Sequence, residues 1–439
     1  MMQKRNLWAV LAAVLLMVLA TNGAMADEKT FKSGDYQYCI LEDGTAEITK
    51  YSGRDRVLKI PNTLDGKTVT SIGKFAFAWS SSLTGIELPD SVTSIGDRAF
   101  NSCSASSIEL PDSVTSMGVN PFADCRSLKN IQVSPEQPVF AVIDGVLFNK
   151  AEKSLICYPA GKQEEAYEVP QGIQQIKSVA FEGCSSLTTI KLPDSVTSIG
   201  NVAFSKCSSL TSIELPDSVT SIGKYAFYGC SALTSIELPD SVTSMGSNPF
   251  KGCGRLKNIQ VSPKQPVFAV IDGVLFNKEE KSLICYPAGK QEEAYEVPQG
   301  IQQIKSVAFE GCSSLTTIKL PDSVTSIEDE AFYGCSALTS IELPDSVTSI
   351  GKYAFYGCSA LTSIELPDSV TSIGESAFSG CSTLTGIELP DSVTSIGDRA
   401  FEGCSNLTIT VQRDSYAARY AKDNNLNYTY PDTNDWLNN

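Results

Sequence analysis

The sequence has 439 residues, a formal net charge of −16 and no histidine. Because histidine is the usual general base and the commonest metal ligand, we predict that the protein is not an enzyme. We expect no catalytic residues, no metal site and no cofactor. The excess of acidic residues argues against a nucleic-acid partner, since phosphate backbones are bound by basic patches.

The N-terminus has the pattern of a secretory signal peptide over residues 1–26. Lys4-Arg5 is a positive region, Leu7–Ala20 is an apolar stretch, and Ala24-Met25-Ala26 fits a small-x-small cleavage site. An uncleaved membrane anchor is the alternative, but the apolar stretch is short for a span of about 20 residues. We therefore expect a secreted or cell-surface protein with no membrane span after signal cleavage.

Residues 27–59 are predicted to form an N-terminal β cap. Tyr36–Ile40 and Ala46–Tyr51 resemble strands and flank Asp43-Gly44, a dipeptide typical of a hairpin turn. Such a hairpin would shield the first apolar layer of a repeat array, whose exposed ends need a polar cover.

From residue 60 to 411 the chain repeats one 23-residue pattern, LTSIELPDSVTSIGxxAFxGCSx. The string LPDSVTS occurs nine times between Leu88 and Leu389, and divergent copies with Ile or Val in the leucine slot bring the total to fifteen. A fixed period of this length is the signature of a repeat solenoid in which each unit is one layer of a shared core. We predict a leucine-rich-repeat-like solenoid of about fifteen coils, without separate globular domains.

One copy shows how its side chains are expected to sort. Ile236 and Leu238 alternate with Ser235 and Glu237, which predicts a short parallel strand with one buried and one exposed face. Pro239 cannot donate to a ladder, so the strand ends there. A second extended stretch follows, and the AFxGC segment is expected to be a brief 3₁₀ or helical turn. The exposed glutamates form a flat ladder that does not converge on a metal ion.

Two residue types occupy fixed slots of the repeat. Twelve of the eighteen phenylalanines are the Phe of AFxGC, and eleven of the fourteen cysteines follow three positions later. We predict that the phenylalanines stack into a core column. Because equal slots offer no designed pairs, we expect the cysteines to be buried free thiols rather than disulfides or zinc ligands.

A larger duplication overlies the repeat, since residues 110–199 recur as 238–327. Each copy contains an insert, near residues 134–168 and 262–296, in which Asp144-Gly145 and Asp272-Gly273 predict hairpins. The hairpins are expected to project from the solenoid or to cover its edge. They are either tolerated insertions or dedicated binding arms.

The AFxGC segments also contain tyrosines at positions that vary between copies. Tyr333 and Tyr356 share one slot in successive coils, so their side chains should lie about 5 Å apart on the surface. Exposed tyrosines are enriched in protein-binding hot spots, although they equally serve as surface padding. The candidate protein-binding residues are Tyr225, Tyr228, Tyr333, Tyr353 and Tyr356.

Residues 412–439 are predicted to form a C-terminal cap. Ser415–Asn424 has the pattern of a short helix, opened by Asp414 or Ser415, and a strand is expected near Asn427–Tyr430. This segment would close the far end of the solenoid.

The motif LPDSVTSIGxxAFxGC resembles the bacterial BspA-like leucine-rich-repeat family of type 5 repeats. The resemblance runs from about Tyr36 to Tyr430 and includes the IDGVLF inserts and the segment SYAARYAKDNNL. It implies a repeat solenoid that is exported or displayed on the cell surface and takes part in adhesion to host proteins or other microbes. It supplies no catalytic residues.

We therefore predict an exported protein that binds a protein partner, on a host matrix or a microbial surface, through a repeated surface. The alternative is a structural spacer or assembly protein without a dedicated ligand. We expect the protein to be a monomer.

Overall fold

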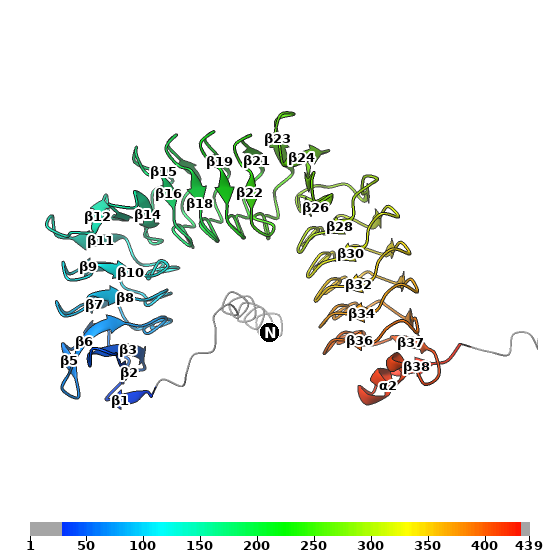
Figure 1. Cartoon of the computed structure of the whole chain (residues 1–439), viewed down its shortest axis with the longest axis horizontal. Helices are drawn as coiled ribbons and strands as arrows, with labels where there is room; N and C mark the ends of the chain where they lie inside the picture. The colour runs from blue at the N-terminus through cyan, green and yellow to red at the C-terminus, as the bar shows by residue number, and fades with distance from the viewer. Residues whose placement is uncertain (1–28, 432–439) are drawn as a thin grey trace, which may run out of the picture.

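The computed structural model describes residues 29–431, which form an open arc of stacked coils with the two described termini at its opposite tips (Figure 1). The predicted signal peptide over residues 1–26 lies outside the described residues, as does the tail from residue 432. No helix among residues 29–431 is long and apolar enough to span a membrane.

Each coil contributes one strand to a first parallel ladder, which is divided into five sheets, and within each sheet equivalent residues of successive coils pair, as Ile190 pairs with Ile213. All fifteen predicted strands are present, and one strand after the last coil adds a sixteenth rung. The rungs are β4 (Val57–Lys59), β7 (Gly85–Glu87), β9 (Ser107–Leu110), β11 (Asn130–Val133), β15 (Ala166–Glu168), β17 (Thr189–Lys191), β19 (Ser212–Glu214), β21 (Ser235–Leu238), β23 (Asn258–Val261), β27 (Ala294–Glu296), β29 (Thr317–Lys319), β31 (Ser340–Glu342), β33 (Ser363–Glu365), β35 (Gly386–Leu389), β37 (Thr408–Val411) and β38 (Asn427–Thr429).

A second parallel ladder is built from the Ser-Ile pair that precedes each Gly-x-x-Ala-Phe. In Figure 1 its strands lie nearer the inside of the arc than those of the first ladder. They are β6 (Lys67–Ile72), β8 (Ser94–Ile95), β10 (Ser116–Met117), β16 (Gln175–Ile176), β18 (Ser198–Ile199), β20 (Ser221–Ile222), β22 (Ser244–Met245), β28 (Gln303–Ile304), β30 (Ser326–Ile327), β32 (Ser349–Ile350), β34 (Ser372–Ile373) and β36 (Ser395–Ile396).

The AFxGC segments form turns, so the expectation of 3₁₀ or helical segments was wrong. Helical geometry needs consecutive residues with negative φ, but the second residue after the Gly slot and the glycine of AFxGC have positive φ in most coils, as at Tyr353 (φ 55°) and Gly380 (φ 76°). The turns nevertheless form a third ladder, because the Phe332 N–H donates to the Ala354 carbonyl of the next coil at 2.8 Å.

The glycine of Ser-Ile-Gly serves a different purpose from the glycine of AFxGC. It has no positive φ, but a Cβ at Gly374 would lie 2.5 Å from the Lys352 nitrogen of the preceding coil. Close approach of neighbouring backbones therefore selects glycine in this slot. Lys177 and Lys305 occupy the slot in the first coil after each insert, and Glu328 occupies it in the coil that follows Lys305.

The phenylalanines stack into columns, as the repeat predicts. Phe332 and Phe355 have ring centroids 5.1 Å apart and an interplanar angle of 10°, and both side chains are fully buried. Nine of the eleven AFxGC thiols donate to the phenylalanine carbonyl of the preceding coil, as Cys358 Sγ does to Phe332 at 3.2 Å, and Cys184 and Cys312 donate to the carbonyls of Tyr158 and Tyr286. This bond explains why a small residue with a weak donor fills the slot.

The inserts do not project as separate arms. The hairpin β12 (Phe140–Ile143) and β13 (Val146–Asn149) is followed by β14 (Ser154–Cys157), which pairs in parallel with β16. The second insert repeats this with β24 (Phe268–Ile271), β25 (Val274–Asn277) and β26 (Ser282–Cys285). Each insert therefore starts a new second ladder, and Tyr158 and Tyr286 take the place of phenylalanine in the core column.

Both ends of the described arc are covered. The antiparallel strands β1 (Phe31–Ser33), β2 (Tyr36–Ile40) and β3 (Ala46–Tyr51) precede β6, and β5 (Thr63–Leu64) pairs with β6. At the other end the helix α2 (Tyr416–Asp423) is capped by Ser415, whose Oγ accepts from the Ala418 N–H at 3.0 Å.

Candidate functional site

The five candidate tyrosines lie along the edge formed by the AFxGC turns. The rings of Tyr333 and Tyr356 are parallel to within 5° with centroids 4.9 Å apart, which agrees with the spacing expected from their shared slot. Tyr353 meets Tyr356 edge-on at 5.9 Å, and Tyr225 lies 6.4 Å from Tyr228. All five side chains are partly buried, so one face of the group rests on the coils beneath.

Lys251 joins the two groups of tyrosines into one surface. Its Nζ lies 5.6 Å from the Tyr225 ring centroid and 5.9 Å from that of Tyr333, although these tyrosines are separated by an insert and by 108 positions in the sequence. A cation at this distance from an aromatic face is attracted to it. We call the continuous surface of Tyr225, Tyr228, Tyr333, Tyr353 and Tyr356 the tyrosine strip.

Two carboxylates hold Lys251 in place. Its ammonium forms an ion pair with Glu330, and Glu310 accepts from the neighbouring Gly252 N–H at 2.8 Å. Burial alone would lower the pKa of Lys251, but the two glutamates outweigh it and raise that pKa. Burial also raises the pKa of Glu310 and raises that of Tyr333 to about 12, so the tyrosine hydroxyl stays protonated and can donate at neutral pH.

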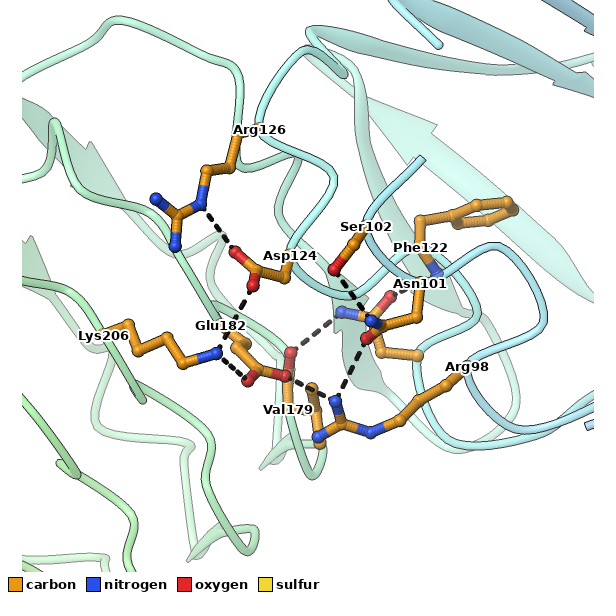
Figure 2. A network of polar contacts seen from close by, with 10 residues as sticks. Arg98, Asn101, Ser102, Phe122, Asp124, Arg126, Val179, Glu182 and Lys206 are labelled. Atoms are coloured by element: carbon orange, nitrogen blue, oxygen red, sulfur yellow. Dashed lines mark hydrogen bonds and ion pairs between the residues drawn. The ribbon is translucent and has the colours of Figure 1, made fainter. Parts of the chain in front are cut away.

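We call the junction between an insert and the coils on either side of it a corner. Lys251 lies at the second corner, and the first corner contains a different polar network (Figure 2). Lys206 Nζ lies 3.1 Å from Glu182 and 3.3 Å from Asp124, while Arg98 Nη1 approaches Glu182 at 2.9 Å. The first corner is therefore clamped by paired charges, and Arg98 and Ser205 stand there in the slots that Tyr225 and Tyr333 fill at the second.

A polar cleft lies beside each insert, with volumes of about 500 Å³ at the first and 350 Å³ at the second. Lys177 lines the first cleft and lies 2.8 Å from Glu152, and this hydrogen bond lowers the pKa of the glutamate. The second cleft repeats the pair as Lys305 and Glu280 at 3.0 Å and adds Glu328 at 3.2 Å from the lysine. Lys177 and Lys305 therefore already form ion pairs with carboxylates of this chain.

The described residues offer little for catalysis or metal binding. Residues 29–431 contain no group of three or more His, Cys, Asp or Glu side chains arranged to hold a metal ion. Burial raises the pKa of the Cys103 thiol to about 12 and also raises that of Cys125, so neither is a reactive thiolate at neutral pH. None of the eleven column cysteines is in a disulfide.

Comparison with known proteins identifies the repeat. The pattern of the BspA type leucine-rich repeat region matches residues 58–156, 157–279 and 288–408, which is most of the chain. The chain belongs to the BspA-type leucine-rich-repeat family. No functionally curated protein matches it.

Solved structures of bacterial repeat proteins share the BspA-type fold. A leucine-rich cell-surface protein from Faecalibacterium prausnitzii is 30% identical over 90% of this chain and 98% of its own, with a TM-score of 0.56. The pneumococcal vaccine antigen PcpA is 21% identical over 93% of this chain and 100% of its own, with a TM-score of 0.54, and supports the fold alone. The BspA-type assignment made from the sequence is thus confirmed.

The structure places all five sequence-predicted tyrosines on one surface, but it does not test whether they bind a partner. Sequence reasoning missed Lys251 and its carboxylates. A signal was present, because Lys251 stands where the first copy of the duplication has Ala123, and Glu330 where it has Val202. Charged residues that replace apolar ones at the same slot of a duplication indicate a changed environment.

Proposed function

We propose that this BspA-type protein is exported and acts at the cell surface or outside the cell, where it adheres to a protein partner through the tyrosine strip. The observation that carries the proposal is the stacked pair of Tyr333 and Tyr356. Neither ring belongs to the core column, and both stacked side chains remain partly exposed, as tyrosines at binding hot spots do. Tyrosine brings a large contact area at low entropic cost.

The surroundings of the strip support this function. Tyr353 donates to Glu375 of the next coil at 3.0 Å, and Lys251 lies against Tyr225 and Tyr333, so three of the five side chains are held before any partner arrives. Preorganised side chains lose less entropy on binding. The similarity to a cell-surface leucine-rich protein is consistent with an exposed location for this chain.

The test replaces Tyr333, Tyr353 and Tyr356 with serine and first confirms an unchanged thermal melt. Binding is then measured to the partner recovered by pull-down from host matrix proteins and neighbouring bacteria. Since hot-spot residues each cost more than about 1 kcal/mol, we expect the triple variant to bind at least about tenfold more weakly. Undiminished affinity in the folded variant would contradict the proposal.

Whole-period deletions separate this function from a structural spacer. Removing Leu343–Glu365 takes out one coil with Tyr353 and Tyr356, whereas removing Leu366–Glu388 takes out one coil without tyrosine. Both deletions preserve the register of 23 residues and should leave shorter, folded proteins. A binding protein loses more affinity in the first deletion, because in the second Asp398 takes the slot of Glu375 beside Tyr353, and a spacer loses the same length in both.

A further inference from the structure

Trp79 departs from the repeat at a position where the departure is costly. It occupies the glycine slot of AFxGC with φ 60°, a left-handed conformation that eight other coils fill with glycine and three fill with the smaller or unbranched Ser102, Asp124 and Lys206. A non-glycine side chain there is strained, because its Cβ crowds the following carbonyl oxygen. The backbone conformation of this slot therefore does not explain why tryptophan occupies it.

The indole of Trp79 also contributes little to the core. Its side chain is 57% exposed, which is unusual for the largest apolar side chain and among the highest values for any large hydrophobic residue described. The other two tryptophans, Trp8 and Trp436, lie outside the described residues. A strained and exposed aromatic residue points to function rather than to folding.

Phe75 turns this exposed indole into a flat platform. Its ring is parallel to that of Trp79 within 10°, with centroids 5.7 Å apart, so one face of the indole rests on Phe75 while more than half of the Trp79 side chain remains exposed. Phe75 also has a positive φ of 55°. Lys74 Nζ lies 5.7 Å from the Phe75 centroid and bounds the platform on that side.

Apart from Lys74 beside Phe75, the side chains next to Trp79 in sequence and in the same slot of the next coil are small, polar and uncharged. Ser80 and Ser81 follow Trp79 directly, and Ser102 fills the same slot in the next coil, where its Oγ accepts from Asn101 Nδ2 at 2.8 Å. A protein hot spot needs a wider apolar surface to exclude water around the anchor. The apolar area here is that of two rings, edged by hydroxyl groups.

From this arrangement we propose that Trp79 and Phe75 form a binding site for a neutral glycan, in which one pyranose ring stacks on the exposed indole. A pyranose presents C–H groups on one face and hydroxyl groups around its rim. The C–H face packs on the aromatic ring, and the rim hydroxyls exchange hydrogen bonds with the serine hydroxyls. The site lies near the N-terminal tip of the arc and does not depend on the tyrosine strip.

The decisive variant is Trp79→Gly, because it restores the residue that eight other coils use at this φ and should fold at least as well as the parent. Binding of the full chain to a microarray of neutral and sulfated glycans is compared for the parent, Trp79→Gly and Trp79→Tyr. We expect neutral pyranose glycans to be bound, about tenfold more weakly after Trp79→Gly and within about threefold of the parent after Trp79→Tyr.

Fluorescence locates the contact. In the full chain with Trp8→Phe and Trp436→Phe, Trp79 is the sole indole, and its emission should shift when the best neutral array glycan is titrated. The variant with serine at Tyr333, Tyr353 and Tyr356 should keep glycan binding, which separates this site from the proposed protein contact.

Several outcomes would overturn the glycan site. They are the absence of neutral-glycan binding by the parent, equal binding by the folded Trp79→Gly variant, and binding restricted to sulfated glycans. Loss of a protein partner in Trp79→Gly with no glycan bound by the parent would instead assign the platform to protein contact.

Discussion

The two insert corners share a backbone arrangement but differ in the side chains that clamp them. At the first corner Asn120 Nδ2 donates to the Val179 carbonyl at 2.8 Å, and at the second Asn248 donates to Val307 at 2.9 Å. The buried Gln137 likewise donates to Val114 and accepts from two backbone N–H groups, as Gln265 does in the second copy. These amides satisfy backbone groups that the interrupted ladder leaves unpaired.

The clamps differ in their charge balance. Glu182 and Asp124 face the cations Arg98, Lys206 and Arg126 at the first corner, whereas among the described residues Lys251 alone faces Glu310 and Glu330 at the second. The two copies of the duplication thus share the amide side chains that form hydrogen bonds with the backbone, but they differ in their ion pairs. The geometry of a corner depends on its amides, and the surface it exposes depends on its charges.

The largest effect should follow from replacing the shared glutamine. Gln137→Leu and Gln265→Leu each leave two buried N–H groups and one carbonyl unpaired, at about 1–3 kcal/mol per group. We expect a loss of about 3–9 kcal/mol in each variant, measured by chemical denaturation. If the two variants differed greatly in their loss of stability, the glutamine would not stabilise the two corners in the same way.

The lysine clamps should differ from each other. Lys251 is 5% exposed and is the only cation beside its two glutamates, so Lys251→Met should cost about 3–5 kcal/mol, the range for a broken buried pair. Lys206 is 26% exposed and Arg98 still faces Glu182 without it, so Lys206→Met should cost about 1–2 kcal/mol. Denaturation midpoints that fall in the reverse order would refute the difference in charge balance.

Removing one carboxyl charge should affect the corners in opposite directions. Burial raises the folded-state pKa of Glu310 above the ordinary 4.5, so the folded chain binds this proton more tightly than the unfolded chain. The difference lowers the free energy of unfolding. This loss is absent when the pH lies below the pKa of Glu310 in the unfolded chain, and it grows as the pH rises through the pKa of Glu310 in the folded chain. Glu310→Gln should therefore raise the melting temperature at pH 8 and leave it unchanged near pH 4.

Glu182→Gln is the matched control for that experiment. Two cations face Glu182, so the loss of its charge should lower the melting temperature at pH 8. Equal responses of the two glutamine variants would contradict the assigned charge balance.

The smallest effect is expected at the tyrosines that replace phenylalanine in the core column. The Tyr158 hydroxyl is buried and has no hydrogen bond within 3.5 Å among the described residues, although burial and the nearby Glu164 raise its pKa, whereas the Tyr286 hydroxyl reaches Glu292 at 3.5 Å. Tyr158→Phe should be neutral or stabilising by up to about 1 kcal/mol, and Tyr286→Phe should be neutral or slightly destabilising. Thermal melts of the paired variants check this, and a marked loss in Tyr158→Phe would reveal a missing partner.

The sequence predicts contacts between neighbouring coils well, because each slot meets the same slot one period away. The stacks of Phe332 on Phe355 and of Tyr333 on Tyr356 follow from that rule alone. Contacts across the inserts, such as Lys251 with Tyr333, depend on how the hairpins turn the chain and have no periodic signature. The positive φ of the AFxGC turns was also missed, because residues as different as Val202 and Tyr225 adopt it under the constraint of the third ladder.

The third ladder gives the arc a distinctive mechanical behaviour. Its hydrogen bonds, like those of both strand ladders, run from coil to coil along the arc, as from Phe332 to Ala354. A force that pulls the two ends apart therefore acts along these hydrogen bonds. The bonds of one coil break before those of the next, whereas a force across the bonds would have to break many of them at once. Each released period of 23 residues adds roughly 75–80 Å of extended chain, so a tethered molecule would lengthen in small steps at low force.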